Sequence, residues 1–372
     1  MLRILGLRLS TDRYIEKTQG QMLLHTWNER HQERDFRKNL FQGLSRILLN
    51  IARVPLPRIG SFTVNDDGSL LLANRPLSVV VQQLENEQIP VDIPRHLTYT
   101  SVDSYVIDIL NCLHDSRLRH QPNGASDKSD CIYQMSALAA MKAVSSLFLR
   151  RDLRHGPFLF NLTDLHQSNI LVDDNWNITC LIDLEWALSS PIEMIHPPRW
   201  LANQDIDQMH EETYDPVRQE FMDILEDTEQ EFSIQPRQRL SLVMKQAWKL
   251  GTFWYTLALR SPMGLVRVFY DHIQPILASG HEENSEFYTI MLEYWTIESI
   301  PFVDQKLADK EDYDRQLREA FEQAAENSQS AFHTNEIAES SRNGLRKVPC
   351  DKPSNTPRPI TPKHDFVHLP GS

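Results

Sequence analysis

Three oxygen-bearing side chains with a defined spacing lie between residues 158 and 187. Asp164 follows an apolar run, Asn169 comes five residues later, and Asp183 comes fourteen residues after Asn169. A carboxylate can accept the proton of an attacking hydroxyl, and amide and carboxylate oxygens are the hard ligands that Mg²⁺ prefers. This order of base, carboxamide and second carboxylate is the one that phosphoryl transfer by a kinase-type loop requires. By position, we expect Asp164 to act as the base and Asn169 and Asp183 to hold a metal.

A strand, a polar loop and a hairpin are the elements that would bring these side chains together. The apolar residues of 158–162 predict a buried strand, and 170–172 predict a second, shorter one. The sequence Asp173-Asp174-Asn175 is turn-forming, and 178–182 predicts the return strand. Asp173 and Asp174 are therefore interpreted as turn residues rather than as metal ligands.

Two further polar residues accompany this segment, and each has two readings. His166 lies two residues after the expected base and could orient the loop or contact substrate. It could equally pack within the loop and bond to the backbone. Glu185 could support the metal site, or it could stabilise the start of a helix through the helix dipole.

The same segment resembles a known family. TDLHQSNILVDD and CLIDLEWA are similar to the catalytic loop and metal-binding segment of the aminoglycoside phosphotransferase and choline kinase-like family, which has a protein-kinase-like fold. The flanking PLPRIGSF, LRHQP and IHPPRWL resemble fungal members of that family. The resemblance covers roughly residues 14–295. It implies an α+β, mainly α fold, namely a kinase carboxy-terminal lobe whose catalytic loop carries a β-hairpin.

The resemblance also implies roles for particular residues. Asp164 would be catalytic, Asn169 and Asp183 would bind both nucleotide and metal, and Glu16 in the expected hinge would bind nucleotide. ATP and magnesium would be the cofactors, and a small molecule with a hydroxyl or amine group would be the acceptor. The sequence departs from the family at Leu162, where catalytic loops usually carry a histidine.

The resemblance further predicts the domain organisation. Residues 1–19 would be a remnant of the amino-terminal lobe and hinge, 20–325 the kinase-like carboxy-terminal lobe, and 326–372 a disordered tail. No GxGxxG or GxxxxGK[ST] motif occurs in the sequence, so we expect the lobe that carries the phosphate-covering loop and its lysine to be largely absent. This leaves an alternative reading, a catalytically inactive, pseudokinase-like or truncated lobe that acts as a binding module.

Composition limits the classes of partner. A formal net charge of −13 argues against a nucleic-acid partner, because phosphate backbones need a basic surface. The negative charge would favour a cationic acceptor, or it could serve solubility alone. No apolar run is long enough to predict a membrane span. The four cysteines are far apart, which favours a reducing compartment, and we expect a cytoplasmic protein.

The rest of the chain predicts mainly helices. Apolar periodicity indicates a helix from Leu40 to about Arg53, and alternation around Asn65-Asp66-Asp67-Gly68 indicates a β-hairpin. His114, near the end of a helix that begins at about Val102, could be a ligand or a solvated helix end, of which we expect the second. Further helices are predicted over 213–234, 239–259 and 309–325, the aromatic-rich segment 287–295 is expected to complete the core, and 77–94 is expected to be a loop with a helical turn.

Overall fold

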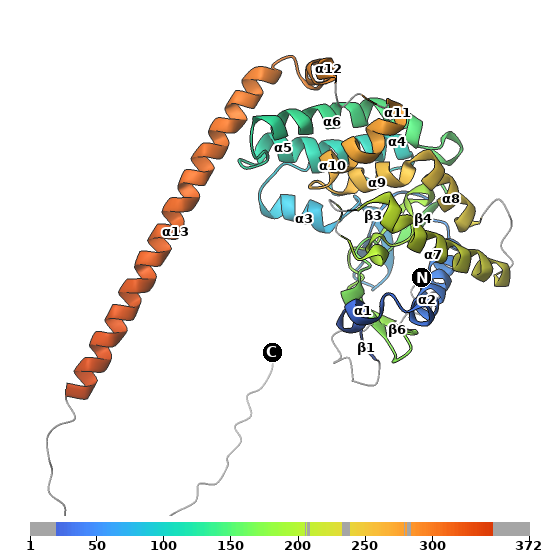
Figure 1. Ribbon diagram of the computed structural model, residues 1–372, viewed down its shortest axis with the longest axis horizontal. Helices are drawn as coiled ribbons and strands as arrows, with labels where there is room; N and C mark the ends of the chain where they lie inside the picture. The colour runs from blue at the N-terminus through green and yellow to red at the C-terminus, as the bar shows by residue number, and fades with distance from the viewer. Residues whose placement is uncertain are drawn as a thin grey trace, which may run out of the picture. The chain divides into compact units, whose positions relative to one another are not determined.

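The computed structural model describes residues 20–344 except 205, 207–208, 233–238, 279 and 281–283, with side chains described as far as residue 325. The fold is mainly helical α+β with two small antiparallel sheets, as the sequence predicts at this level (Figure 1). The α-helices are α1 (Leu24–Arg30), α2 (Arg34–Ala52), α3 (Val79–Asn86), α4 (Val102–Ile109), α5 (Arg117–His120), α6 (Lys128–Phe148), α7 (Glu211–Glu231), α8 (Leu240–Leu250), α9 (Thr252–Arg260), α10 (Leu265–Val268), α11 (Gln274–Leu277), α12 (Ser285–Trp295) and α13 (Ser299–Gly344). Two π-helical segments are η2 (Leu110–Ser116) and η9 (Phe269–Ile273), and short 3-10 turns include η4 (Gln167–Asn169), η5 (Ile192–Met194) and η6 (Arg199–Ala202).

The segment that carries the candidate residues contributes strands to both sheets. One sheet has the order β1-β5-β6, and the other has the order β3-β2-β7-β4. The strands are β1 (Gln21–Met22), β2 (Gly60–Val64), β3 (Leu70–Asn74), β4 (Phe158–Asn161), β5 (Ile170–Val172), β6 (Ile178–Leu181) and β7 (Leu188–Pro191). The chain leaves one sheet after β4, forms the β5–β6 hairpin, and returns through β7 to pair with β4. Asp164, Asn169 and Asp183 lie in the segments that connect the two sheets, between β4 and β5 and between β6 and β7.

The turn between β5 and β6 confirms the predicted role of its aspartates. One carboxylate oxygen of Asp173 accepts the backbone N–H groups of Asn175 and Asn177, each at 2.9 Å. Trp176 adopts a left-handed backbone conformation with φ of 63°. Its indole is buried and stacks on Trp27 with ring centroids 5.5 Å apart. The hairpin is thereby fixed both by its turn and by packing against α1.

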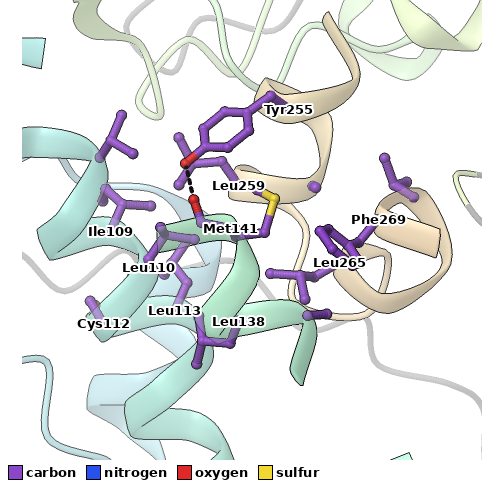
Figure 2. Close-up of a cluster of buried hydrophobic side chains, with 14 of the residues drawn as sticks. Ile109, Leu110, Cys112, Leu113, Leu138, Met141, Tyr255, Leu259, Leu265 and Phe269 are labelled. Carbon is purple, nitrogen blue, oxygen red and sulfur yellow. Dashed lines mark hydrogen bonds between the residues drawn. The ribbon is translucent and has the colours of Figure 1, made fainter. Parts of the chain in front are cut away.

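The larger hydrophobic core lies where α4, α6, α9 and α10 contact one another (Figure 2). The hydroxyl of Tyr255 donates to the carbonyl of Met141 at 2.9 Å, which ties α9 to α6 inside this core. His114 belongs to the same region, so its expected place at a solvated helix end is wrong. Only 6% of His114 is exposed, and its Nε2 lies 2.8 Å from the carbonyl oxygen of Leu259. The packing of η2 against α9 buries the ring, which the local pattern alone could not indicate.

Several helix boundaries differ from the predictions for identifiable reasons. The helix expected over 239–259 is two helices, α8 and α9, because Gly251 takes the left-handed conformation (φ 79°) that ends α8. The segment 77–94, expected to be mostly loop, contains the full helix α3, whose N-cap Ser78 accepts the N–H of Val81. Gln21 and Met22 form strand β1, which pairs with β5. The predicted hairpin around Gly68 is confirmed as β2–β3.

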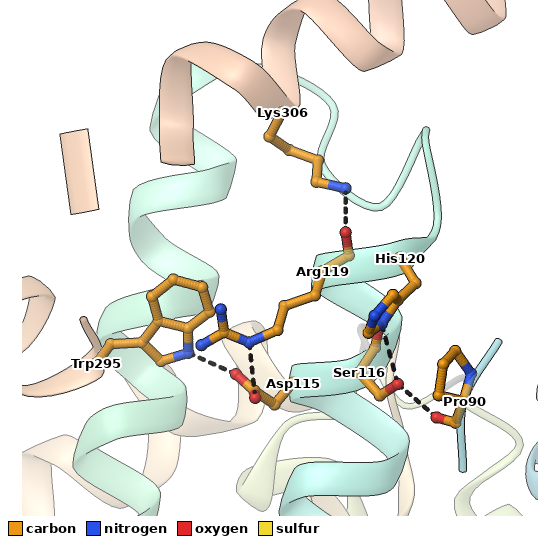
Figure 3. Close-up of polar contacts among 7 residues, drawn as sticks. All are labelled: Pro90, Asp115, Ser116, Arg119, His120, Trp295 and Lys306. Carbon is orange, nitrogen blue, oxygen red and sulfur yellow. Dashed lines mark hydrogen bonds and ion pairs between the residues drawn. The ribbon is translucent and has the colours of Figure 1, made fainter. Parts of the chain in front are cut away.

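The first part of α13 is anchored to α5 by a buried lysine (Figure 3). Lys306 is 2% exposed and donates to the carbonyls of Arg119 and Gln121 at 3.0 and 3.1 Å. The Arg119 guanidinium lies over the ring of Trp295, 3.9 Å from its centroid, and Asp115 accepts from both of these side chains. Lys306 therefore satisfies carbonyl groups at the end of α5 that have no partner within the helix.

The predicted domain boundaries at residues 19 and 325 remain predictions. Residues 1–19, including Glu16, lie outside the described residues. The chain forms two compact units, one ending at Tyr313 and the other beginning at Asp314. The predicted polar helix over 309–325 forms part of α13, whose helical backbone continues through Gly344 into the predicted tail. Residues 345–372 of that tail lie outside the described residues.

Two further expectations can be compared with the described part of the chain. None of its helices is long and apolar enough to span a membrane. Cys112, Cys131 and Cys180 carry free thiols there, in keeping with the absence of a predicted disulfide framework. Burial raises the pKa of the Cys112 thiol to about 12, so this side chain acts as an apolar core residue.

Candidate functional site

The expected base, Asp164, follows strand β4 and opens onto a cleft. Asp164 is solvent-exposed, and the preceding Leu162 is buried in the core beside α2. The cleft has a volume of about 480 Å³, which lies in the range of small-molecule sites. A second, smaller pocket of about 200 Å³ also has Asp164 in its lining. The carboxylate is thus accessible to a ligand from the cleft.

Asn169 is held against Asp164 by its own side chain. It ends the short 3-10 turn η4, is 8% exposed, and its Nδ2 donates to the backbone carbonyl of Asp164 at 2.9 Å. The same amide nitrogen lies 3.5 Å from a carboxylate oxygen of Asp164. Its amide oxygen accepts the hydroxyl of Ser168 at 3.2 Å. The structure therefore brings together two of the three residues that the sequence predicted, and the amide oxygen of Asn169 keeps acceptor capacity for a ligand.

Asp183 lies at the other end of the hairpin, directly beside the backbone of Asn169. The N–H of Ile182 donates to the carbonyl of Asn169 at 3.0 Å, one step beyond the Ile170–Leu181 strand pair. Asp183 is exposed and has a φ of 53°. A left-handed conformation at a non-glycine residue is uncommon, although aspartate tolerates it better than most, and such positions cluster at functional sites. Here the left-handed conformation occurs at Asp183, the residue that the sequence predicts to be a metal ligand.

The loops that carry Asp164 and Asp183 are also joined directly. The hydroxyl of Thr163 donates to the carbonyl of Trp186 at 2.6 Å. Immediately beyond this bond, Asn161 pairs with Leu188 in the β4–β7 ladder. Trp186 and Asp164 line the same smaller pocket. The segments 161–164 and 183–188 therefore run side by side and are joined by hydrogen bonds next to the candidate site.

The donor set matches magnesium in its chemistry. The exposed carboxylate of Asp183 and the amide oxygen of Asn169 are hard oxygen ligands, and Mg²⁺ typically takes one or two protein ligands and completes its shell with water and phosphate. No cluster of three or more histidine, cysteine or acidic side chains that could hold a metal occurs in the described part of the chain. A transition-metal centre of the zinc type is therefore not indicated there, whereas a sparse oxygen site is compatible with the residues present.

His166 and Glu185 occupy different positions around the site. His166 lines the cleft, with its ring edge-on to Trp200 at a centroid distance of 6.3 Å. Burial, and secondarily the charge of Arg199, lower the pKa of His166 below its usual value. Glu185 is exposed and lies in the loop between β6 and β7. The indole N–H of Trp200 donates to the carbonyl of Leu165 at 2.7 Å, which fixes the wall beside His166.

Three residues of the cleft were not identified from the sequence. Thr256 and Arg260 come from α9, and His196 comes from the proline-rich segment after η5. The sequence signal for the first two is the helical spacing of Phe253, Thr256 and Arg260, which places them on one face of α9. The sequence predicted a helix over 239–259 but gave no indication of a cleft beside it.

Comparison with protein-family models, with curated proteins and with solved structures finds no match to this chain.

Proposed function

We propose that the protein is an ATP- and magnesium-dependent phosphotransferase of the kinase-like carboxy-terminal-lobe type, acting on a hydroxyl or amine of a small molecule. The proposal is supported above all by the junction at β4, where Asp164 faces a cleft of ligand size and Asn169 bonds back to it. Asp183 follows the residue that pairs with Asn169, in a left-handed conformation. The resemblance of the two motifs to aminoglycoside phosphotransferases supports the same reading.

In the proposed reaction each residue has one task. The acceptor hydroxyl lies in the cleft, and its proton passes to the carboxylate of Asp164 as its oxygen attacks the terminal phosphorus of ATP. The bond from that phosphorus to the bridging oxygen breaks, and ADP leaves. Asn169 and Asp183 would hold magnesium, which when bound neutralises charge on the phosphates. The amide of Asn169 also holds the loop of Asp164 in place.

A thermal-shift titration with magnesium-ATP tests this proposal. We expect the wild-type protein to be stabilised, and Asp183→Asn to lose that stabilisation because the substitution removes the charge of one ligand. Asp174→Asn is a matched control, since it changes an equally exposed aspartate at the hairpin turn that lies away from the site. Wild-type protein with no magnesium-dependent shift, or an equal loss in both variants, would remove the support for a nucleotide site.

The alternative is a binding module without turnover. It is favoured by the sequence, which contains neither the GxGxxG nor the GxxxxGK[ST] motif. Kinase-like enzymes enclose the phosphates with a glycine-rich loop and a lysine. Stabilisation by magnesium-ATP together with no phosphoryl transfer to any acceptor in a radiolabelled-ATP assay would favour this second reading.

A further inference from the structure

Three residues that line one wall of the 480 Å³ cleft each carry a buried polar atom without a hydrogen-bond partner. Within the described part of the chain, Nη2 of Arg260, Oγ1 of Thr256 and Nε2 of His196 are buried and make no hydrogen bond. Thr256 is 2% exposed. Unpaired buried polar atoms destabilise a folded protein, and each one calls for an explanation. A ligand that accepts hydrogen bonds would satisfy all three.

The protein holds this wall rigidly. Thr256 and Arg260 are one helical turn apart on α9, so both project to the same side. The guanidinium of Arg260 is fixed through its other arm, because Nη1 donates to the carbonyl of Met194 at 3.3 Å. The ring of His196 packs edge-on against Phe253 at 5.2 Å. The three atoms are therefore pre-positioned, which lowers the entropic cost of binding.

The charge of the cleft differs from that of the whole chain. Among the described residues that line it, Asp164 is the single carboxylate, whereas Arg199 and Arg260 are both cations. Burial lowers the pKa of His196 to about 3, so its ring is neutral and can donate one hydrogen bond. The whole chain has a net charge of −13, whereas the cleft beside Asp164 has more positive than negative side chains.

The opposite wall is apolar. Leu44, Ile47 and Leu48 of α2 line it at helical spacing. An aliphatic segment would bury its surface there, and the removal of apolar surface from water favours binding. Neither Asn169 nor Asp183 belongs to the described lining, so the cleft extends from Asp164 away from the proposed metal ligands. It is therefore on the acceptor side of the site.

We infer that the wall formed by Arg260, Thr256 and His196 binds the carboxylate of the acceptor, and that the acceptor is a small aliphatic hydroxy acid. The carboxylate takes hydrogen bonds from Arg260 and from the two neutral groups, the carbon chain lies along α2, and the hydroxyl reaches Asp164. Guanidinium groups bind carboxylates with charge-assisted hydrogen bonds. The assignment of the hydroxyl to a transfer step rests on the proposed function; the binding of the carboxylate does not.

Binding without nucleotide tests the inference separately from catalysis. Isothermal titration calorimetry with ω-hydroxyhexanoate, ω-hydroxyhexanamide and ω-aminohexanol compares three probes of equal chain length that carry a negative, neutral or positive end. We expect ω-hydroxyhexanoate to bind at least about tenfold more tightly than the other two, because one charge-assisted hydrogen bond accounts for that much. Equal affinities, tighter binding of ω-aminohexanol, or no binding of any probe would overturn it.

Two variants test whether Arg260 and Thr256 are responsible for the tighter binding of the carboxylate probe. Arg260→Gln should abolish the preference for the carboxylate probe, and urea denaturation establishes whether the variant remains folded. Thr256→Val should weaken carboxylate binding while leaving the protein as stable as the wild type or more so, since the lost hydroxyl has no partner in the free protein. Ser45→Ala removes an equally unpaired hydroxyl on α2 outside the cleft lining and should leave binding unchanged.

If folded Arg260→Gln still prefers the carboxylate probe, the inference is contradicted. Carboxylate binding without phosphoryl transfer would contradict only the proposed function.

Discussion

The hydroxyl of Thr163 donates to the carbonyl of Trp186 across 2.6 Å and so joins the loop of the candidate base to the loop of the candidate metal ligand. Thr163 directly precedes Asp164, and Trp186 is three residues after Asp183. The bond lies where the chain passes from β4 and returns into β7. The Thr163 hydroxyl is thus one of the contacts that set the position of Asp164 relative to Asp183.

Removal of that hydroxyl should impair catalysis more than stability. We expect Thr163→Val to lower the rate of phosphoryl transfer about tenfold, because small displacements of reacting groups have large effects on rate. Thr163 is exposed, so the free energy of unfolding should fall by about 1 kcal/mol or less. Steady-state kinetics and urea denaturation measure the two effects. Thr163→Ser keeps the donor and should retain the wild-type rate; an equal loss in both variants would show that the methyl group, rather than the bond, matters.

The buried His114 predicts a stability that declines in acid. Burial lowers the pKa of His114 to about 4, below its ordinary value of 6.5, so the folded protein keeps the ring neutral. The unfolded chain gains a proton as the pH falls below 6.5, and this contribution to stability, on the order of 3 kcal/mol, is lost between pH 6.5 and 4.

A comparison of two proteins isolates this contribution. Urea denaturation of the wild type and of His114→Gln between pH 4 and 7 gives the free energy of unfolding at each pH. Glutamine retains an N–H donor toward Leu259 but cannot titrate, so the variant should show a shallower dependence on pH. His196, whose pKa is also lowered by burial, should maintain part of the slope. Parallel curves for the two proteins would mean that His114 is not the titrating group.

Lys306 should contribute measurably to the attachment of α13. Lys306→Met removes two hydrogen bonds made by a buried, charged donor, and the carbonyl of Gln121 keeps only the N–H of Gly124, so we expect a loss of about 2 kcal/mol in the free energy of unfolding. Lys245→Met is the control, since that lysine forms a half-exposed ion pair with Glu226 and such pairs contribute about 0–1 kcal/mol. Equal effects in denaturation experiments would argue against a special role for Lys306.

Two glycines with the same backbone conformation should differ in their tolerance of alanine. Gly251 and Gly68 both have a φ of 79°, so each substitution introduces strain of about 1 kcal/mol. A methyl group at Gly251 would also lie 2.8 Å from Ile276 and 3.0 Å from Phe148, whereas at Gly68 it meets no atom within 4 Å.

Thermal denaturation should therefore rank the two variants. Gly251→Ala is expected to lower the melting temperature clearly more than Gly68→Ala, because overpacking adds about 1–3 kcal/mol to the strain. Gly251 is also the N-cap of α9, which carries Thr256 and Arg260, so its variant should bind cleft ligands more weakly. Similar melting temperatures would indicate that the neighbours of Gly251 move aside.

The sequence by itself determined the local elements around the candidate site. The strands β4, β5 and β6 and the turn at Asp173 follow from residue types that act within a few positions of one another, because turn formation and strand alternation are local. The order Asp164, Asn169 and Asp183 also carried the chemical hypothesis. The contact between Asn169 and Asp164 is also local, since the two residues are five positions apart and Asn169 ends the short 3-10 turn that follows Asp164.

Only the tertiary structure decided what faces Asp164 across the cleft. Helical spacing put Thr256 and Arg260 on one face of α9, but periodicity does not say which distant segment that face meets. The same limit explains the error at His114, where packing of α9 against η2 replaced solvent with the carbonyl of Leu259. Contacts between segments far apart in the chain depend on the packing of the whole core, and no local pattern encodes them. The residues of the proposed reaction were therefore readable in the sequence, and the residues proposed to choose the substrate were not.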